Sequence, residues 1–348
     1  MNARAPVNDK PDLEQFYRRI GAENMTPLWE VMSGLVPPEP RTPTVPAQWK
    51  WQTTRPYLLE SGTLISAEQA DRRVLVLENP GMRGASCITH SLYAGLQLIL
   101  PGEVAPSHRH TATAVRLIME GEGGYTAVDG ERTPMFPGDF IITPSWTFHE
   151  HGNGGNIPMI WLDGLDVPMI QFFDAAFSER YPEKRQALTR NADDALARFG
   201  TAGMVPDDYQ ATSLHNPLFR YPYAATRASL ERLRANGNVH PSHGVKLRFT
   251  HPGTGGWPTP TIGAFMQLLP ADFRGTPCRR TDGTVFCVVE GHGTSRIGDT
   301  DITWNSGDVF VAPSWTSVSH HAGAESVLFS MSDKPVQQAL GIWRESAG

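Results

Sequence analysis

The chain has 348 residues, enough for two domains whose cores need no disulfide or metal for stability. Its formal net charge of −6, without a run of Lys or Arg, argues against a nucleic-acid partner. Three cysteines in no redox or metal spacing, no signal peptide and no apolar run of membrane-spanning length favour a cytoplasmic protein with no membrane attachment.

The first predicted elements are two helices. A second short helix is expected to take Thr26 as its N-cap and Pro27 as its first residue. The proline-rich stretch at residues 36–46 then predicts an extended connector that crosses the surface or a neighbouring subunit. We therefore expect residues 1–70 to form an N-terminal helical arm. The stripe that predicts the first helix has spacing i, i+3, i+4, i+7: Leu13, Phe16, Tyr17 and Ile20.

From residue 73 the hydrophobic period changes to two, which indicates strands. Many short strands separated by turn residues are typical of an antiparallel barrel or double-sheet roll. Helical spacing returns over residues 169–177 and is expected to close a first barrel at residues 71–180. Residues 181–245 are predicted to be a linker with helices. The expected strands of this barrel lie at residues 73–78, 96–100, 115–119, 140–142 and 159–162.

The second half of the chain repeats the first. Met-Glu-Gly-Glu-Gly at residues 119–123 returns as Val-Glu-Gly-His-Gly at residues 289–293. Residues 137–146 return at residues 306–315 with the same Gly-Asp and Pro-Ser-Trp. Two copies offset by about 170 residues indicate a duplicated barrel, with the second copy at residues 246–348.

Three histidines form the candidate metal site. His108 and His110 are two apart, so on a strand both imidazoles point to one face, and His149 arrives from a distant strand. Neutral imidazole is the commonest protein ligand for iron, zinc or copper. The glycines and prolines around these histidines resemble the two motifs of the cupin barrel. The resemblance implies a mainly β bicupin, with two double-stranded β-helix (jelly-roll) barrels in one chain.

The repeat serves as an internal control on this site. Alignment of the two copies places Cys278 opposite His108, Arg280 opposite His110 and Val318 opposite His149. The second copy evidently folds without the triad, so we interpret the triad as functional and expect one metal ion per chain. His320 and His321 lie near the lost site and are expected to be surface or interface residues.

The expected metal is Fe(II). Metal-binding cupins commonly add a glutamate four or five residues past the second histidine, and here those positions hold Ala114 and Val115. Three neutral imidazoles leave about half an octahedral shell open for a chelating substrate and O2, whereas structural zinc would want a fourth ligand. Zinc hydrolysis, manganese decarboxylation and nickel lyase chemistry remain open on ligand type alone.

Strand parity predicts which other side chains face the cavity. If residues 108–116 form one strand without a bulge, Arg116 points inward with the histidines, where a planar fork suits a carboxylate. Alternatively, Arg116 lies at the barrel mouth and its guanidinium reaches solvent. His151 shares a face with His149. The same parity predicts four further residues that face the cavity. For each of them, a hydrogen-bonded polar group at the barrel rim and a direct role in the site are equally good interpretations. These residues are Tyr93, Gln97, Trp161 and Asp163.

Several longer segments resemble the gentisate 1,2-dioxygenase family, together with its relatives that cleave salicylate and 1-hydroxy-2-naphthoate. The resemblance runs from about residue 12 to about residue 345 and implies iron held by His108, His110 and His149. It also implies a homotetramer, in which the N-terminal arm would lie on a neighbouring subunit. Cys278, Cys287 and residues 317–319 depart from the family pattern. The segments that carry the resemblance are residues 24–30, 73–80, 108–116, 128–132, 137–153 and 219–223.

The resemblance implies a function and a role for each candidate. We expect a Fe(II)-dependent dioxygenase that uses O2 to open gentisate to maleylpyruvate, between the carboxyl-bearing and the adjacent hydroxyl-bearing carbon. Salicylate, a 5-substituted salicylate or 1-hydroxy-2-naphthoate are alternative substrates, and a non-catalytic bicupin that binds aromatic acids is the alternative of another class. The candidate catalytic residues are His151 and Asp163; the candidate substrate-binding residues are Arg116, Gln97, Arg72 and Tyr93.

Overall fold

The computed structural model describes residues 12–211 and 213–347. The chain divides into two compact units, one ending at Arg41 and the other beginning at Thr42. The first unit contains α1 (Leu13–Ala22) and α2 (Leu28–Leu35). Both predicted helices are confirmed, but α2 begins one residue later than expected, with Pro27 rather than Thr26 at the N-cap and no side-chain cap.

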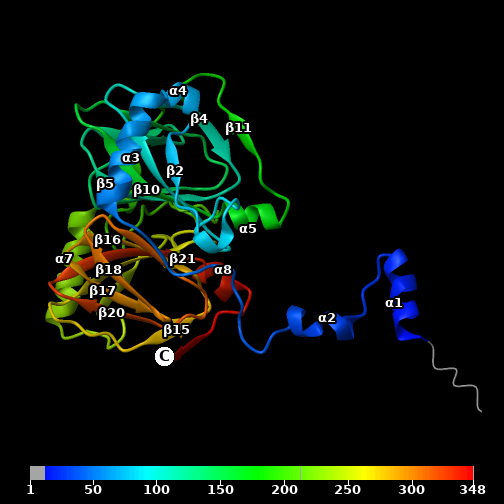
Figure 1. Cartoon of the computed structure of the whole chain (residues 1–348). Helices are drawn as coiled ribbons and strands as arrows, with labels where there is room; N and C mark the ends of the chain where they lie inside the picture. The colour runs from blue at the N-terminus through cyan, green and yellow to red at the C-terminus, as the bar shows by residue number, and fades with distance from the viewer. Residues whose placement is uncertain (1–11, 212, 348) are drawn as a thin grey trace, which may run out of the picture. The chain divides into compact units, whose positions relative to one another are not determined.

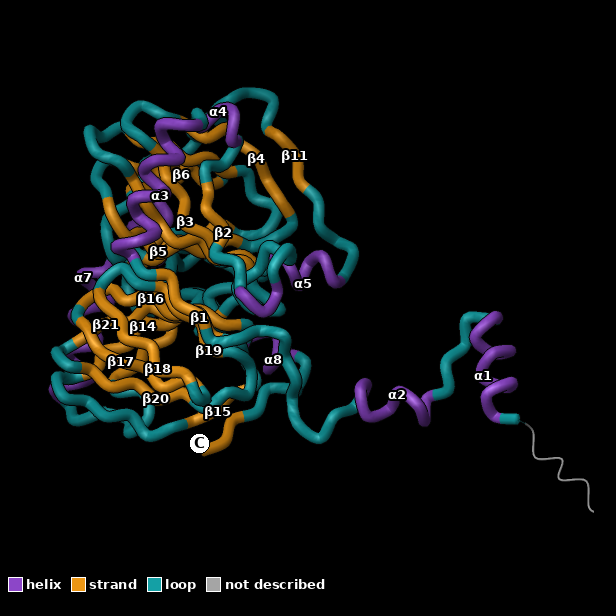
Figure 2. The backbone as a smooth tube through the Cα atoms, viewed as in Figure 1, coloured by secondary structure: helices purple, strands orange, loops and turns teal. Residues whose placement is uncertain are grey.

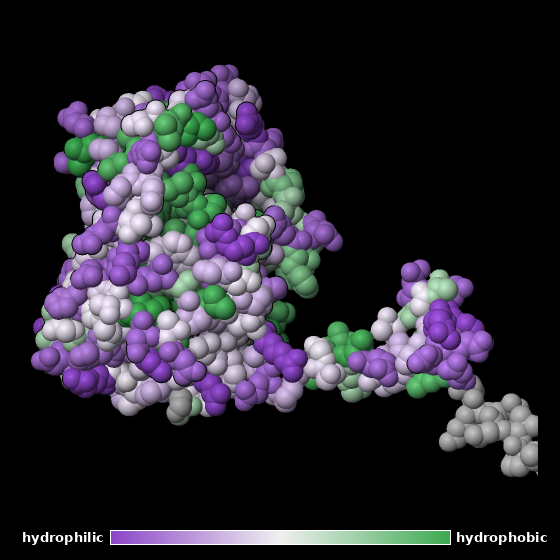
Figure 3. Space-filling model, viewed as in Figure 1, coloured by the Kyte–Doolittle hydropathy of each residue, from purple (hydrophilic) through white to green (hydrophobic). Residues whose placement is uncertain are grey.

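The apolar side chains of α2 are exposed, whereas in α1 Leu13 is exposed and the rest of the stripe is half-buried. Tyr17 joins the two helices, because its hydroxyl accepts a hydrogen bond from Trp29 Nε1 at 2.7 Å and donates one to Glu30 at 2.8 Å. No residue of either helix is buried, and Figure 3 shows apolar side chains at the surface of α2. An exposed apolar face of this kind on a helix pair is typical of a segment that packs on another surface. The exposed apolar side chains include Leu13, Leu28, Trp29, Met32 and Leu35.

The second unit consists of two barrels, each made of a six-stranded and a five-stranded sheet (Figures 1 and 2). The larger sheet of the first barrel has the order β12-β8-β5-β10-β3-β2 and the smaller has β11-β4-β9-β6-β7. All pairings are antiparallel, as the period of two predicts. The strands are β2 (Val74–Val76), β3 (Tyr93–Ile99), β4 (Val104–His110), β5 (Ala114–Glu120), β6 (Gly124–Val128), β7 (Glu131–Pro134), β8 (Phe140–Thr143), β9 (His149–Asn153), β10 (Met159–Leu165), β11 (Ser178–Arg180) and β12 (Arg220–Tyr221).

The second barrel repeats this arrangement. Its larger sheet has the order β1-β19-β16-β21-β14-β13 and its smaller sheet β18-β17-β20-β15-β22. The Pro-Ser-Trp turns coincide: Trp146 N donates to His110 O at 2.8 Å and Trp315 N to Arg280 O at 2.6 Å. The strands are β1 (Ala47–Trp49), β13 (Val245–Arg248), β14 (Gly263–Leu269), β15 (Cys278–Arg280), β16 (Thr284–Glu290), β17 (His292–Ile297), β18 (Thr300–Asn305), β19 (Val309–Ala312), β20 (Val318–Ala322), β21 (Ser326–Ser332) and β22 (Glu345–Ala347).

Helices fill the connections between and around the barrels. The helix predicted over residues 169–177 is shorter than expected: α5 ends at Phe172, and the chain then leaves helical geometry to form β11 beside β4. Beyond Phe172 the apolar spacing therefore does not mark a buried helical face, and Phe173 and Phe177 are exposed. The helices of this unit are α3 (Trp51–Leu64), α4 (Ala67–Ala70), the 3₁₀ helix η1 (Pro80–Met82), α5 (Val167–Phe172), α6 (Asp194–Phe199), α7 (Tyr223–Ala235) and α8 (Lys334–Ala339).

Part of the predicted N-terminal arm belongs to the compact barrel unit. β1 pairs with β19 of the second barrel, with Gln48 opposite Phe310, and α3 packs on β3 of the first barrel. Asp308 fixes this segment, since its carboxylate accepts from Trp51 N at 2.7 Å and Gln48 Nε2 at 3.2 Å. The boundary proposed at residue 70 stays a prediction, whereas the compact unit itself begins at Thr42.

The two barrels pack back to back through their six-stranded sheets. Alternate residues of β5 separate the two sides: Val115 and Leu117 belong to the large core shared with the second barrel, whereas Ile118 belongs to the interior of the first. On β10, Ile160 and Leu162 face the shared core and Trp161 faces the interior. This alternation follows from the period of two and leaves each barrel an interior of its own. No helix among the described residues has the length and apolar character needed to cross a membrane.

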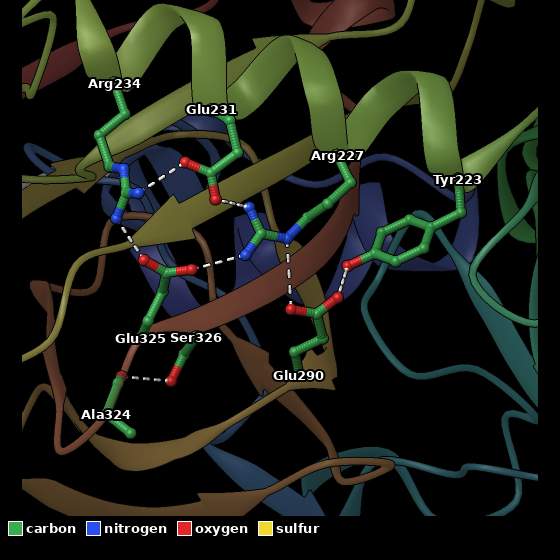
Figure 4. Close-up of polar contacts among 8 residues, drawn as sticks. All are labelled: Tyr223, Arg227, Glu231, Arg234, Glu290, Ala324, Glu325 and Ser326. Atoms are coloured by element: carbon green, nitrogen blue, oxygen red, sulfur yellow. Dashed lines mark hydrogen bonds and ion pairs between the residues drawn. The ribbon is translucent and has the colours of Figure 1, made fainter.

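An ion-pair network fastens α7 to the second barrel (Figure 4). Glu325 accepts from Arg227 Nη2 at 2.5 Å and also pairs with Arg234. Arg227 further pairs with Glu290, and Tyr223 donates its hydroxyl proton to the same carboxylate. The network joins two of the helix's arginines to one carboxylate at the edge of β21, so it fixes the helix against the sheet.

Replacing Glu325 with Gln should lower the free energy of unfolding by roughly 0.5–1 kcal/mol. The amide keeps the shape but removes the charge that two arginines share, and the Glu325 side chain is 33% exposed, so solvent weakens the effect. Urea unfolding at low salt and at about 1 M NaCl measures it, and the difference from wild type should shrink in high salt. Glu122→Gln, at an exposed position, is the matched control. A loss independent of salt would contradict an electrostatic origin.

Candidate metal centre

Three imidazoles meet inside the first barrel. His108 and His110 lie on β4 and His149 lies on β9, with His108 directly opposite His149 in the antiparallel register. Each offers one ring nitrogen, and these three atoms lie within 4.8 Å of one another. The ring centroids are 4.6–5.3 Å apart. Arg109, between the two ligands of β4, points the other way and stacks on Trp146, as strand alternation requires.

Backbone carbonyls orient two of the three rings. His110 Nδ1 donates to Ala112 O at 2.7 Å, and His149 Nδ1 donates to Thr147 O at 2.9 Å. Each bond places the ring proton on Nδ1, so the Nε2 lone pair is free for a metal ion. Burial, the largest cause, lowers the pKa of His110 to about 4 and that of His149 well below its usual value. Both imidazoles are therefore neutral at physiological pH, the form that binds metal.

The third ring has a different neighbour. His108 Nδ1 lies 2.7 Å from Arg72 Nη2, which also donates to Pro106 O at 2.7 Å. Arginine can only donate, so His108 Nδ1 accepts and a neutral His108 carries its proton on Nε2. Burial and then Arg72 lower the pKa of His108 to about 2. A metal ion on Nε2 of His108 therefore requires that the proton leave or that Arg72 turn away.

Arg116 is buried inside the barrel, where its guanidinium contacts Asp163 and Thr143. It is opposite Asp163 in the β5–β10 register, with Arg116 Nε 3.0 Å from Asp163 Oδ1 and both side chains at most 5% exposed. The angle between them is not that of a hydrogen bond. Arg116 Nη1 donates to Thr143 Oγ1 at 2.6 Å. Burial lowers the pKa of Arg116 and raises that of Asp163, while their mutual attraction opposes both shifts, so the ion pair is retained.

The inward position of Arg116 agrees with strand parity, but the premise of one strand over residues 108–116 is wrong. β4 ends at His110, residues 111–113 turn, and β5 begins at Ala114 in the other sheet of the barrel. β4 also carries a bulge between Ala105 and His108, so the pairing register with β9 changes just before the two histidines. The turn brings the chain across the barrel, so the histidines and Arg116 approach the cavity from different sheets.

Several buried polar groups around the triad have no hydrogen-bond partner among residues 12–211 and 213–347. These are Gln97 Nε2, His151 Nδ1 and Trp161 Nε1, each on a side chain no more than 3% exposed. Gln97 is opposite Trp161 across β3 and β10, and the His151 and Trp161 rings lie 5.3 Å apart. Buried polar groups without a partner are costly, so such a cluster is typical of a site completed by a ligand.

Tyr93 and Arg72 complete the candidate residues. Tyr93 begins β3 and is partly buried; burial, followed by the nearby charge of Asp163, raises its pKa above its ordinary value. Arg72 precedes β2, and burial lowers its pKa to about 10. Arg72, Arg116 and Asp163 influence one another's pKa values, so all three lie close together. The carboxylates of Asp71 and Glu150 also act on Arg72, but two buried guanidinium groups still offer charged donors to an anionic ligand.

The donor set fits a divalent metal with open positions. Among the described residues the group of candidate ligands has three members, all histidines, and no carboxylate joins them. Three neutral imidazoles on one side of an ion are the arrangement of a catalytic site, since a structural zinc site would be closed by a fourth ligand. The second barrel places Cys278 opposite Val318 where the first places His108 opposite His149, and the loss of a metal site there stays a prediction.

The expectation for His320 is wrong. His320 is 5% exposed, its Nδ1 lies 2.7 Å from Ser295 Oγ, and its ring packs on Phe286. It lies two residues past Val318 as His151 lies two past His149, so alternation directs it into the second barrel. His321 is half-buried, with Nδ1 bonded to Phe273 O at 2.9 Å. The same parity that identified His151 would have identified His320.

No pattern in the sequence predicts two of the contacts at the site. Arg72 reaches His108 from the segment before the barrel, and Thr143 at the end of β8 fixes Arg116. Both depend on how distant strands meet, and neither residue type is distinctive. Arg72 was a candidate only through the family resemblance, and Thr143 was not a candidate.

Comparisons with known proteins agree with this geometry. The Cupin domain family matches residues 95–165, which span β3 to β10. The chain is 49% identical over 333 residues to gentisate 1,2 dioxygenase 1 of Aquipseudomonas alcaligenes, covering 96% of each chain. It is 34% identical to a 5-aminosalicylate 1,2-dioxygenase of a Comamonas species, covering 99% of this chain and 92% of that one. A solved structure of salicylate 1,2-dioxygenase from Pseudoaminobacter salicylatoxidans, in adducts with gentisate, superposes with a TM-score of 0.91 at 33% identity, covering 99% and 96% of the two chains.

Proposed function

Because the chain belongs to the gentisate 1,2-dioxygenase family of ring-cleaving bicupin enzymes, we propose that it opens gentisate with O2 at an Fe(II) ion held by His108, His110 and His149. The bond between the carboxyl-bearing carbon and the adjacent hydroxyl-bearing carbon breaks, both oxygen atoms enter the product, and that product is maleylpyruvate. The observation that carries the proposal is an open three-histidine group in a cavity that also contains two buried arginines, Arg72 and Arg116. Relatives named for gentisate support the choice of substrate.

Arg116 is proposed to anchor the substrate carboxylate. Its Nε faces Asp163 and its Nη1 is bonded to Thr143, while Nη2 has no hydrogen-bond partner among the described residues. A guanidinium held on two sides cannot rotate freely, so its remaining donor points in a fixed direction. Arg72 adds a second positive group on the histidine side of the cavity, beside His108. Together the two arginines orient a 2-hydroxy acid and favour its ionised form.

The uncharged groups are proposed to act on the ring hydroxyls. His151 is neutral, because burial holds its pKa well below the usual value, and its Nδ1 has no hydrogen-bond partner in the described part of the chain. It is suited to exchange a proton with a phenolic oxygen. Gln97 Nε2 and the hydroxyl of Tyr93 are further groups for the ring substituents. A bound Fe(II) would supply the path for electrons between ring and O2 that side chains lack.

For Asp163 we propose a positioning role. Its carboxylate faces Arg116 at 3.0 Å, so its direct effect is on the guanidinium rather than on the reacting ring. Assembly into tetramers also stays a prediction, supported by the apolar side chains that α1 and α2 expose.

The test is anaerobic loading with Fe(II), followed by O2 uptake with gentisate, salicylate, 5-substituted salicylates and 1-hydroxy-2-naphthoate. We expect gentisate to react fastest, one O2 to be consumed per ring, and the product to show the mass and absorbance of maleylpyruvate. Faster turnover of 5-aminosalicylate or 1-hydroxy-2-naphthoate, for which other relatives are named, would change the substrate but keep the reaction. Tight binding without a ring-opened product from any substrate would favour a non-catalytic bicupin instead.

A further inference from the structure

The second barrel has lost the metal ligands but keeps a cavity. Its lining comes from both sheets and includes Lys246, Gln267, Cys278, Arg280 and His320. The cavity has a volume of about 30 Å³. By the measure in which one water needs about 10–15 Å³, it holds two or three waters or a single ion of three to four heavy atoms. An aromatic ring would not fit without movement of the lining.

Gln267 is the most informative residue of this cavity. It is 0% exposed, and neither its amide nitrogen nor its amide oxygen has a hydrogen-bond partner within the part of the chain that the structure describes. Gln267 occupies the position on β14 that Gln97 occupies on β3, five residues into an equivalent strand. A buried amide with both groups unpaired costs free energy unless something bound in the cavity satisfies it. The residue therefore points to a small polar occupant.

Positive charge surrounds this amide. Lys246 is directly opposite Gln267 in the β13–β14 register, and its Nζ lies 4.5 Å from the centroid of the Phe265 ring. Among the described residues, Arg280 pairs with Glu345 at 2.7 Å, whereas Lys246 forms no ion pair. Asp282 also lines the cavity, and its carboxylate, which accepts from Trp343 Nε1 at 2.7 Å, contributes one negative charge. The lysine thus lies near two further cations, Arg280 and Lys334, and near one carboxylate, that of Asp282.

Burial and the nearby cations lower the pKa values of the ionisable groups in this cavity. Burial, followed by Arg280, lowers the pKa of Lys246 to about 7. Burial, followed by Lys246, lowers the pKa of His320 to about 3 and that of His243 to about 3. Both histidines are therefore neutral and add no charge of their own. A buried site of this polarity gains most from one negative ion.

We propose that the interior of the second barrel binds one small planar oxyanion, of the size of hydrogencarbonate, formate or acetate, through Lys246, Arg280 and the amide of Gln267. The cations supply the charge, the amide N–H donates to one oxygen, and the cavity volume excludes larger acids. The site lies in the barrel without metal ligands, so it goes beyond the proposed ring cleavage and does not depend on it.

The test uses the full-length, iron-loaded protein at about pH 7. Thermal unfolding and titration calorimetry follow additions of sodium formate, acetate or hydrogencarbonate, with ionic strength held constant by sodium chloride. We expect each oxyanion to raise the unfolding temperature, and the best of the three identifies the ligand. Lys246→Met and Gln267→Leu should weaken binding at least tenfold. Lys50→Met, at an exposed lysine, should bind as wild type does, and Arg72→Met serves to detect anion binding in the first barrel.

Two results would overturn the proposal. One is no response of the wild type to any of the three oxyanions beyond that to chloride, which would leave only water in the cavity. The other is a response that survives in Lys246→Met and disappears in Arg72→Met, which would place the anion in the first barrel. If Lys246→Met does not fold, Gln267→Glu keeps the test decisive. It places a carboxylate beside Lys246 and should fold without responding to oxyanions, and an unchanged response in this variant would also count against the site.

Discussion

Replacing His149 with Val is expected to remove bound iron and ring cleavage together, while the protein stays folded. The second barrel carries Val318 at the equivalent position, opposite Cys278 in the same register, so this barrel geometry accepts valine there. His149 is neutral and buried, and its replacement leaves no unpaired charge. With two histidines left, we expect iron content to fall below roughly one tenth per chain and turnover to fall on the order of 10³-fold.

Metal analysis after Fe(II) loading, circular dichroism and O2 uptake with gentisate measure the three parts of this prediction. His292→Val, at an exposed histidine of β17, is the matched control and should keep its iron and its activity. Wild-type iron content in His149→Val would mean that the metal is held elsewhere. Loss of the fold would contradict the equivalence of the two barrels.

The parts of the site predicted from the sequence are those that follow from local alternation and from the repeat. His108 and His110 share a face because a strand has a period of two, and the second copy showed which residues the fold does not need. The same alternation placed Trp161 and Gln97 inside the barrel correctly. These predictions held because neighbouring positions on one strand determine them.

Contacts between distant strands could not be predicted in this way. The pairing of Arg116 with Asp163 depends on the register of β5 against β10, and the contact of Arg72 with His108 depends on the path of the chain before β2. The turn at residues 111–113 interrupts what reads as a continuous strand, since its residues are compatible with either conformation. The absence of ligands around His320 does not predict exposure, because strand alternation alone directs this side chain inward.

Replacing Asp163 with Asn should lower the free energy of unfolding by roughly 3–5 kcal/mol, because it leaves the Arg116 guanidinium buried without its counter-charge. Both side chains are at most 5% exposed, so water cannot replace the lost carboxylate. A bound substrate carboxylate can replace it in part. Salicylate should therefore raise the unfolding temperature of Asp163→Asn more than that of the wild type. Asp301→Asn, in an exposed pair with Arg296, is the control and should change stability by less than about 0.5 kcal/mol.

The second barrel supplies the variant that separates stability from binding. There Phe286 is opposite Ser330, in the register where Arg116 is opposite Asp163. The double variant Arg116→Phe with Asp163→Ser removes both charges and should recover most of the stability lost in Asp163→Asn, since no buried charge is left unpaired. It should also lose the stabilisation by salicylate and raise KM for gentisate, with little change in iron content. Full salicylate stabilisation in the double variant would show that the carboxylate binds elsewhere, and Arg72, beside His108, would then be its anchor.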